Sequence, residues 1–352
     1  MEKGEKKEKV LAYLRRGIQS GKWKDEILPK EEELAEKLHM ARGTVRKAFA
    51  QLVAEGMLER RKRRGTMLIK SFQEKPVIGT VMRCQDHYYE DVFRILKEKT
   101  EASGRHLQFT DTYGFRIPTF RTHIRQGIAS ILKAPITNLI LDGLCFPSYP
   151  MLEKLLRRNP VFFDFFDGEV PPGATGVLID YYKIGRMGAE YLLNRGCRRP
   201  LLFCGPLPPA KRYAPEKFAI HRDKRLLDGF ADVLKEAGMD PWLHICMADS
   251  GWKTIDRLMF DIFSSPSCRP DGIFCSEDVK VVKLLNIAEE CGYDPPHKIG
   301  IFDTPWSQGE DGHWFSSIAI SPEESADALL QQVLLPPEQR ENIYLKCSLV
   351  KR

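Results

Sequence analysis

The clearest alternation of hydrophobic and polar positions in the chain lies in residues 41–53. The apolar residues recur at helical spacing and form one stripe: Val45, Ala48, Phe49, Leu52 and Val53. Arg42, Gly43, Arg46 and Lys47 form a second, basic face of the same predicted helix. Such a face suits insertion into the major groove of DNA, where arginine binds guanine edges or phosphates; the alternative is an ordinary solvated surface.

The neighbouring segments favour DNA binding. Residues 6–20 and 31–38 have the apolar spacing of two further helices, and the second begins with an acidic turn. Residues 57–69 contain two short apolar runs around a basic tip that includes Arg63, Arg64 and Gly65, which predicts a β-hairpin. We therefore expect residues 1–70 to form a winged helix-turn-helix domain, mainly α with a β-hairpin wing, and residues 71–76 to form a linker.

This N-terminal segment resembles the GntR family of winged helix-turn-helix regulators. The resemblance rests on Gly21, Leu28-Pro29, Glu31, Glu33-Leu34-Ala35, Thr44-Val45-Arg46, Leu52, Glu55-Gly56 and Gly65-Thr66. It implies DNA contacts from the recognition helix and the wing tip. With the basic residues above, the candidate contacts are Lys30, Arg42, Gly43, Thr44, Arg46, Lys47, Arg63, Arg64 and Gly65. Glu32 stands where the family often has an arginine that contacts a base, so the operator sequence cannot be copied from relatives.

Charge is concentrated in this segment. Residues 1–75 hold 20 Lys and Arg against 12 Asp and Glu, whereas the other 277 hold 34 against 36. A basic N-terminal segment (the head, residues 1–70) before a nearly neutral remainder (the body, residues 77–352) predicts a polyanionic partner for the head alone. No apolar run approaches the roughly 20 residues of a membrane span, and the N-terminus lacks the apolar core of a signal peptide, so we expect a cytoplasmic protein without a membrane partner. The nine cysteines form no C-x-x-C pair, and most are expected to be reduced and buried; no metal or cofactor is expected.

In residues 77–352, strand-like apolar runs alternate with segments of helical length. The runs include 77–82, 139–141, 161–163, 201–205 and 272–275. This alternation predicts parallel sheets with helices on both faces. Because residues 77–352 exceed the usual size of a single α/β domain, we expect two lobes with a ligand cleft between them.

The order of motifs in the body resembles the LacI/GalR-type effector domain, which is related to periplasmic sugar-binding proteins. The motifs are Ile78-Gly79-Thr80-Val81, Ile179-Asp180, Gly185, Gly188-Ala189, 192–200, Arg225, Gly229-Phe230, 270–278, Ile301-Phe302-Asp303, Leu345 and 349–352. The resemblance implies an α/β two-lobed periplasmic-binding-protein-like domain that dimerises. A GntR-type head on such a body is similar to arabinose-repressor-like regulators.

Polar residues follow several predicted strands, and open α/β sheets bind ligands beyond the carboxyl ends of their strands. Asp86, Tyr88 and Tyr89 follow the first strand, where a carboxylate and aromatic rings suit a sugar. The resemblance implies cleft roles for Asp164, Glu277 and Asp303, and for a basic residue before Gly229. The spacing leaves this residue as Lys224 or Arg225, and favours Arg222 less. Trp306 and Trp314 follow Asp303; either could stack on a sugar ring, but burial in the core is the expectation for both.

We therefore predict a transcription regulator, and specifically a repressor, whose DNA affinity changes when a small carbohydrate binds between the lobes. A homodimer would bind an inverted-repeat operator, because two-fold symmetry in the protein is mirrored in the site. Three alternatives remain: a DNA-binding regulator whose body only dimerises, a solute-binding protein, and an enzyme acting on a sugar. No nucleophile elbow, P-loop or metal set supports the enzyme.

Overall fold

The computed structural model describes residues 3–19, 23, 27–54, 57–61, 65–68, 77–84, 87–111, 118–134, 136, 138–143, 152–164, 170–205, 222–247 and 252–352. The chain divides into two compact units, of which the first is Met1–Gly79 with Lys97–Gln108 and Ala129–Thr137, and the second is the remainder. Among the described residues, no helix is long and apolar enough to cross a membrane. The expected linker, residues 71–76, lies outside the described residues.

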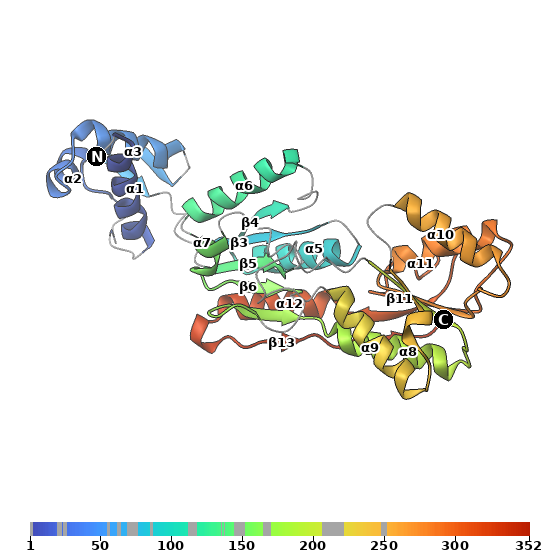
Figure 1. Cartoon of the computed structure of the whole chain (residues 1–352). Coiled ribbons are helices and arrows are strands. Elements are labelled where there is room, and N and C mark those ends of the chain that lie inside the picture. The colour runs from blue at the N-terminus through green and yellow to red at the C-terminus, as the bar shows by residue number, and fades with distance from the viewer. Residues whose placement is uncertain are drawn as a thin grey trace. The chain divides into compact units, whose positions relative to one another are not determined.

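The described residues of the N-terminal domain form three helices and a hairpin (Figure 1). Its elements are α1 (Lys3–Gln19), α2 (Glu31–Lys37), α3 (Arg42–Ala54), β1 (Leu58–Arg61) and β2 (Gly65–Leu68). The strands pair antiparallel from Leu58 opposite Leu68 to Arg61 opposite Gly65. The predicted apolar stripe of α3 is inside: Val45, Ala48, Phe49 and Leu52 are fully buried, and Val53 is partly buried. The winged helix-turn-helix prediction is confirmed.

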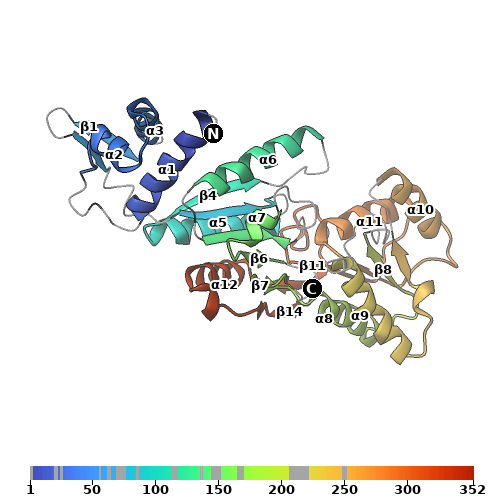
Figure 2. The same ribbon diagram turned by 60° about the vertical axis from the view of Figure 1, so that its left-hand side comes forward.

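The rest of the chain forms two α/β lobes, each built on a six-stranded sheet (Figure 2). Lobe 1 has the strand order β13-β7-β6-β5-β3-β4, and lobe 2 has the order β14-β12-β11-β10-β8-β9. Lobe 1 contains β3 (Val77–Met82), α5 (His87–Ala102), β4 (His106–Asp111), α6 (Pro118–Lys133), β5 (Asn138–Asp142), α7 (Leu152–Leu156), β6 (Val161–Phe163), β7 (Thr175–Leu178), α12 (Pro322–Leu334) and β13 (Ile343–Tyr344). Lobe 2 contains α8 (Tyr181–Asn194), β8 (Pro200–Cys204), α9 (Arg222–Glu236), β9 (Ile245–Met247), α10 (Trp252–Ser264), β10 (Gly272–Cys275), α11 (Asp278–Glu290), β11 (His297–Ile301), β12 (Ser316–Ile320) and β14 (Cys347–Val350).

The expected parallel arrangement is confirmed for most strand pairs. Strands β5, β6, β7 and β13 run parallel, as do β8, β9, β10, β11 and β12, whereas β14 returns antiparallel to β12. The chain crosses between the sheets after β7, after β12 and between β13 and β14. Neither lobe is therefore a continuous stretch of sequence.

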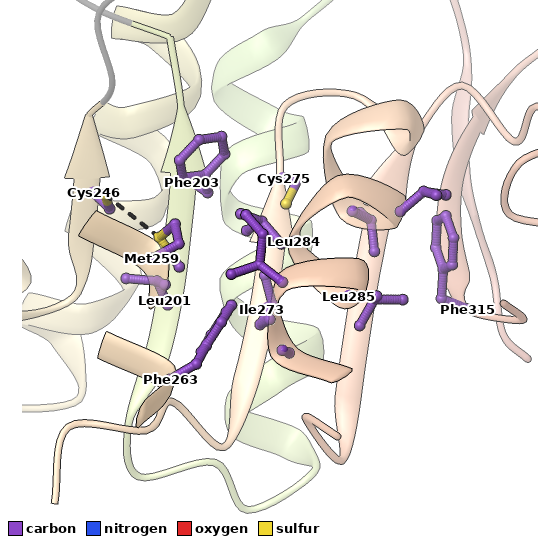
Figure 3. Packing of buried hydrophobic residues seen from close by; sticks show 14 residues of the cluster. Leu201, Phe203, Cys246, Met259, Phe263, Ile273, Cys275, Leu284, Leu285 and Phe315 are labelled. Carbon is purple, nitrogen blue, oxygen red and sulfur yellow. Dashed lines mark hydrogen bonds between the residues drawn. The ribbon is translucent and has the colours of Figure 1, made fainter. Parts of the chain in front are cut away.

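The core of lobe 2 follows from the alternation of residues along its strands. Leu201, Phe203, Ile273 and Cys275 point toward α10 and α11, where Met259 and Phe263 meet them (Figure 3). Burial raises the pKa of the Cys204 and Cys275 thiols, which keeps them protonated and unreactive. Among the eight cysteines in the described residues, Cys197, Cys204, Cys246 and Cys275 are buried and the other four are partly or fully exposed, so the expectation that most are buried is met by half of them.

On the other side of that sheet, two glycines allow α8 and α9 to touch through their backbones. A Cβ atom on Gly185 would lie 2.1 Å from the carbonyl oxygen of Leu226, and one on Gly229 would lie 2.0 Å from that of Tyr182. Backbone atoms cannot give way as a flexible side chain would. Close helix packing therefore explains both glycines without a ligand.

We predict that Gly185→Ala or Gly229→Ala destabilises lobe 2 by about 1–3 kcal/mol, because the added methyl group overpacks the helix contact. Gly43→Ala is the matched control, since a Cβ there meets nothing within 4 Å. Alanine is the better helix former by up to about 1 kcal/mol, so the control should unfold no more easily. Urea denaturation of the three variants checks this, and unchanged stability of both lobe 2 variants would contradict the close contact.

Candidate functional site

The exposed face of α3 carries the residues predicted to contact DNA. Arg42, Gly43, Arg46 and Lys47 are exposed, and Thr44 is half-buried. Lys30 is exposed immediately before α2, and Gly65 is exposed at the start of β2 with a φ of +87°. Packing does not require glycine at position 43, because a Cβ would meet no atom there. Arg63 and Arg64, at the predicted wing tip, lie outside the described residues.

The acidic first turn of α2 connects three parts of this domain. Glu31 Oε1 lies 2.7 Å from Arg60 Nη2 on the wing strand β1. Glu32 Oε1 lies 2.6 Å from Arg42 Nη2 on α3. The backbone N–H of Lys30 donates to Glu33 Oε2 over 3.3 Å, which caps the start of α2. The sequence predicted an acidic turn that complements the helix dipole but gave no sign of these partners.

In lobe 1, the predicted residues Tyr88, Tyr89 and Asp164 come together and are buried. The hydroxyl groups of Tyr89 and Tyr181 both donate to Asp164 Oδ2, the second over 3.1 Å. The Tyr88 hydroxyl lies 2.9 Å from Ser325 Oγ on α12. In this conformation Asp164 therefore orders two tyrosines and is not exposed to solvent. Asp86 lies outside the described residues.

An ion pair that the sequence analysis missed lies beside this cluster. Arg83 Nε is 3.3 Å from Asp142 Oδ2, and the backbone N–H of Arg83 donates to the same oxygen over 3.1 Å. The guanidinium group also lies 4.6 Å from the centre of the Tyr89 ring, within cation–π range. Asp142 is the last residue of β5 and Arg83 directly follows β3 of the same sheet, and that position was the signal that could have identified them.

In lobe 2, two more carboxylates are paired with cations at strand ends. Asp303 Oδ1 lies 2.6 Å from Arg352 Nη1, and their side chains are 21% and 18% exposed. Glu277 Oε2 lies 3.7 Å from Lys280 Nζ, which also donates to Ser276 Oγ over 2.6 Å. Glu277 and Asp303 were predicted from the sequence, whereas Lys280 and Arg352 were not.

The other predicted residues of lobe 2 have structural partners. Lys224 forms an ion pair with Asp228, and the Arg225 guanidinium lies 5.2 Å from the centre of the Tyr182 ring. Trp306 is partly buried against the lobe 2 core and lies edge-on to His87. The expectation that Trp314 would be buried was wrong: it is 67% exposed, because it covers the tight turn at Gly309 outside the core.

A cavity of about 540 Å³ lies between the two lobes. It is lined by His87, Tyr88 and Asp91 of α5, by residues 302–305 and Gln308, and by 319–322, Glu324, Lys346 and Ser348. Tyr88 stacks on Phe302 of the opposite lobe with ring centres 4.5 Å apart. The volume is within the usual range of about 300–1,000 Å³ for small-molecule sites. Asp303 is one of the residues that line the cavity.

Asp278 supports the backbone beside Asp303. The N–H and hydroxyl of Thr304 donate to its Oδ2 over 2.7 and 2.9 Å, and Ser317 donates to its Oδ1 over 2.8 Å. These donors favour the carboxylate, but burial outweighs them and raises the pKa of Asp278 to about 6. Below its unfolded pKa of 3.8 the group is neutral in both states and its burial costs little.

We predict that Asp278 lowers stability progressively as pH rises from about 4 through 6, because the folded protein then loses its extra proton. Relative to Asp278→Asn, the free energy of unfolding should fall by up to roughly 3 kcal/mol over this interval and then level off. Urea denaturation of both proteins between these pH values measures the difference. A difference that grows with pH would mean that the three donors outweigh burial.

Comparison with known proteins covers both parts of the chain. The family model described as bacterial regulatory proteins, gntR family, matches residues 6–68. The arabinose metabolism transcriptional repressor of Halalkalibacterium halodurans is 24% identical over 293 residues, which cover 77% of this chain and 72% of that protein.

Two solved structures show the fold of the body. A LacI family transcriptional regulator from Lactobacillus casei with bound glucose has a TM-score of 0.60 and 18% identity, and the match covers 79% of this chain and 99% of that one. The transcriptional regulator CelR in complex with cellobiose also has a TM-score of 0.60, with 16% identity, and covers 92% of this chain and 98% of that one. Residues 6–68 thus form a gntR-family DNA-binding domain, and the chain is a transcription regulator, not an enzyme, in which this domain precedes a two-lobed body with the fold of LacI-type regulators.

Proposed function

We propose that this regulator is a homodimeric repressor that binds an inverted-repeat operator and is controlled by a small uncharged carbohydrate between its lobes. The observation that carries the DNA-binding part is the exposed basic face of α3, with Arg42, Arg46 and Lys47 on one side of a helix whose other side is buried. The unexplained Gly43 on this face leaves room for close approach of a base edge.

Three ion pairs at the strand ends support an uncharged polyhydroxyl effector. They are Arg83–Asp142, Lys280–Glu277 and Arg352–Asp303. A sugar hydroxyl is both a donor and an acceptor, so a carboxylate beside a cation satisfies both of its roles. Of these six residues Asp303 lines the cavity, whose other charged side chains are Asp91, Glu324 and Lys346, so the cavity offers no cluster of cations to a phosphate or uronate.

The names of similar proteins point to the same class of ligand. One is an arabinose metabolism repressor, and the two solved structures contain glucose and cellobiose. We infer that binding changes how the lobes meet and, through the dimer, how the two heads are spaced. A coupling free energy of about 1–3 kcal/mol would be ordinary for such a regulator.

An exposed apolar face on lobe 2 supports the homodimer. Phe260 of α10 and Val279 of α11 are 46% and 40% exposed and line a surface hollow. Arg257 beside them can pair with Asp311 or Glu290 of a second copy, because both signs of charge occur on the rim. Exposed apolar side chains surrounded by polar groups are typical of an interface.

A second candidate function is supported by the burial of the lobe 1 cluster. Tyr89 and Asp164 are both fully buried. If that arrangement persists in solution, the body serves only to dimerise the DNA-binding domains. The sugar measurement below separates the two functions.

We predict that Arg42→Ala and Arg46→Ala each weaken sequence-specific DNA binding by about 1–3 kcal/mol or more, because each removes a base or phosphate contact. Both side chains are exposed, so the folded dimer should remain intact. Fluorescence anisotropy with a selected operator and sedimentation velocity measure the two properties. Unchanged DNA affinity in both variants would contradict the proposal that α3 contacts DNA. A wild-type protein that sediments as a monomer would contradict the proposed homodimer.

We predict that at least one uncharged sugar raises the melting temperature of the full-length protein by a few degrees. Ligand at 100 times its dissociation constant stabilises the native state by about 2.7 kcal/mol. The panel should include L-arabinose, glucose, cellobiose, sugar phosphates and uronates. Asp303→Ala should abolish the shift, whereas Asp294→Ala should keep it, because the Asp294 side chain is 78% exposed and lines neither the cavity nor the apolar hollow. A shift with charged sugars alone would contradict the proposal of an uncharged effector. If no sugar changed the melting temperature, the result would favour a body that only dimerises.

A further inference from the structure

We propose that Glu32 and Arg42 act together as one reader of a G·C base pair, with Glu32 determining the specificity of the recognition helix. This inference rests on the proposed reading of an operator by α3. It begins from the contact between Arg42 Nη2 and Glu32 Oε1 at 2.6 Å, which joins α2 to the first residue of α3. The side chains are 65% and 52% exposed, so both remain accessible to DNA.

The contact is too exposed to have stability as its main effect. Ion pairs between solvent-exposed side chains contribute only about 0–1 kcal/mol. The adjacent acids of α2 already have structural roles, since Glu31 is paired with Arg60 of the wing and Glu33 caps the helix. Glu32 instead fixes the direction of a guanidinium group on the face that carries Arg46 and Lys47.

The chemistry of the pair matches one base pair better than the others. In the major groove, a G·C pair presents two acceptors, guanine N7 and O6, followed by the donor N4–H of cytosine. Arg42 has five N–H donors, of which the contact with Glu32 occupies one, and the Glu32 carboxylate retains capacity to accept a hydrogen bond. Two N–H donors of Arg42 and the acceptor oxygen of Glu32 together match all three groups of the G·C edge. Adenine offers the single acceptor N7, so it would use only one of the arginine donors.

The carboxylate also weakens the alternative contact of Arg42 with the DNA backbone. A phosphate close to Arg42 would also lie close to Glu32 and be repelled by it. Glu32 therefore lowers non-specific affinity while it directs the arginine toward bases. The open space around Gly43, next to Arg42, allows the start of α3 to approach the base edge.

Selection of binding sites from a random-sequence duplex pool tests this inference, with wild type, Glu32→Gln and Glu36→Gln in parallel. Glu36 is exposed one turn further along α2, so its variant removes the same charge without touching the contact with Arg42. Wild type and Glu36→Gln should enrich half-sites with one fixed G·C pair. In Glu32→Gln the preference for that pair should fall roughly five- to hundredfold.

Anisotropy titrations on an unselected duplex provide a second readout. Glu32→Gln should bind it more tightly than Glu36→Gln does, and the slope of log affinity against log salt should become steeper by about one phosphate contact. An unchanged G·C preference in Glu32→Gln, or an equal loss in Glu36→Gln, would overturn the inference and leave the proposed function standing. If wild type enriched no sequence at all, the proposed operator reading would fail as well. Melting curves of both variants show that each is folded.

Discussion

The turn after β11 is the constraint on which the proposed ligand site depends. Phe302 and Asp303 have φ angles of +92° and +52°, a region that costs a residue other than glycine about 1–3 kcal/mol. Hydrogen bonds from Thr304 to buried Asp278 hold the backbone, and Arg352 holds the Asp303 carboxylate. Because Phe302 stacks on Tyr88, the same strained turn is also one of the contacts between lobe 2 and lobe 1.

This arrangement explains how one site can respond to a ligand and affect both lobes. A group that competes with Arg352 for Asp303 acts on a turn that is already strained and already touches α5. A ligand that binds one conformation of this turn more tightly than another therefore also shifts the equilibrium of the contact between the lobes.

The sequence predicted those features that depend on local periodicity. The faces of α3 follow from the spacing of Val45, Phe49 and Leu52, and the parallel strands follow from runs of buried residues. It could not predict partners distant in the chain, such as Arg352 for Asp303 or Arg42 for Glu32, because many charged residues compete for each contact. Nor did the strand-end position of Asp164 reveal that two tyrosines would enclose it.

The central claim is that a sugar in the body changes the affinity of the head for DNA. The most direct test measures operator affinity of the full-length protein by fluorescence anisotropy, with and without each uncharged sugar of the panel. The account predicts that one sugar changes the dissociation constant by roughly 5- to 150-fold, the usual range of allosteric coupling. An operator affinity that stays constant while the same sugar binds would contradict it.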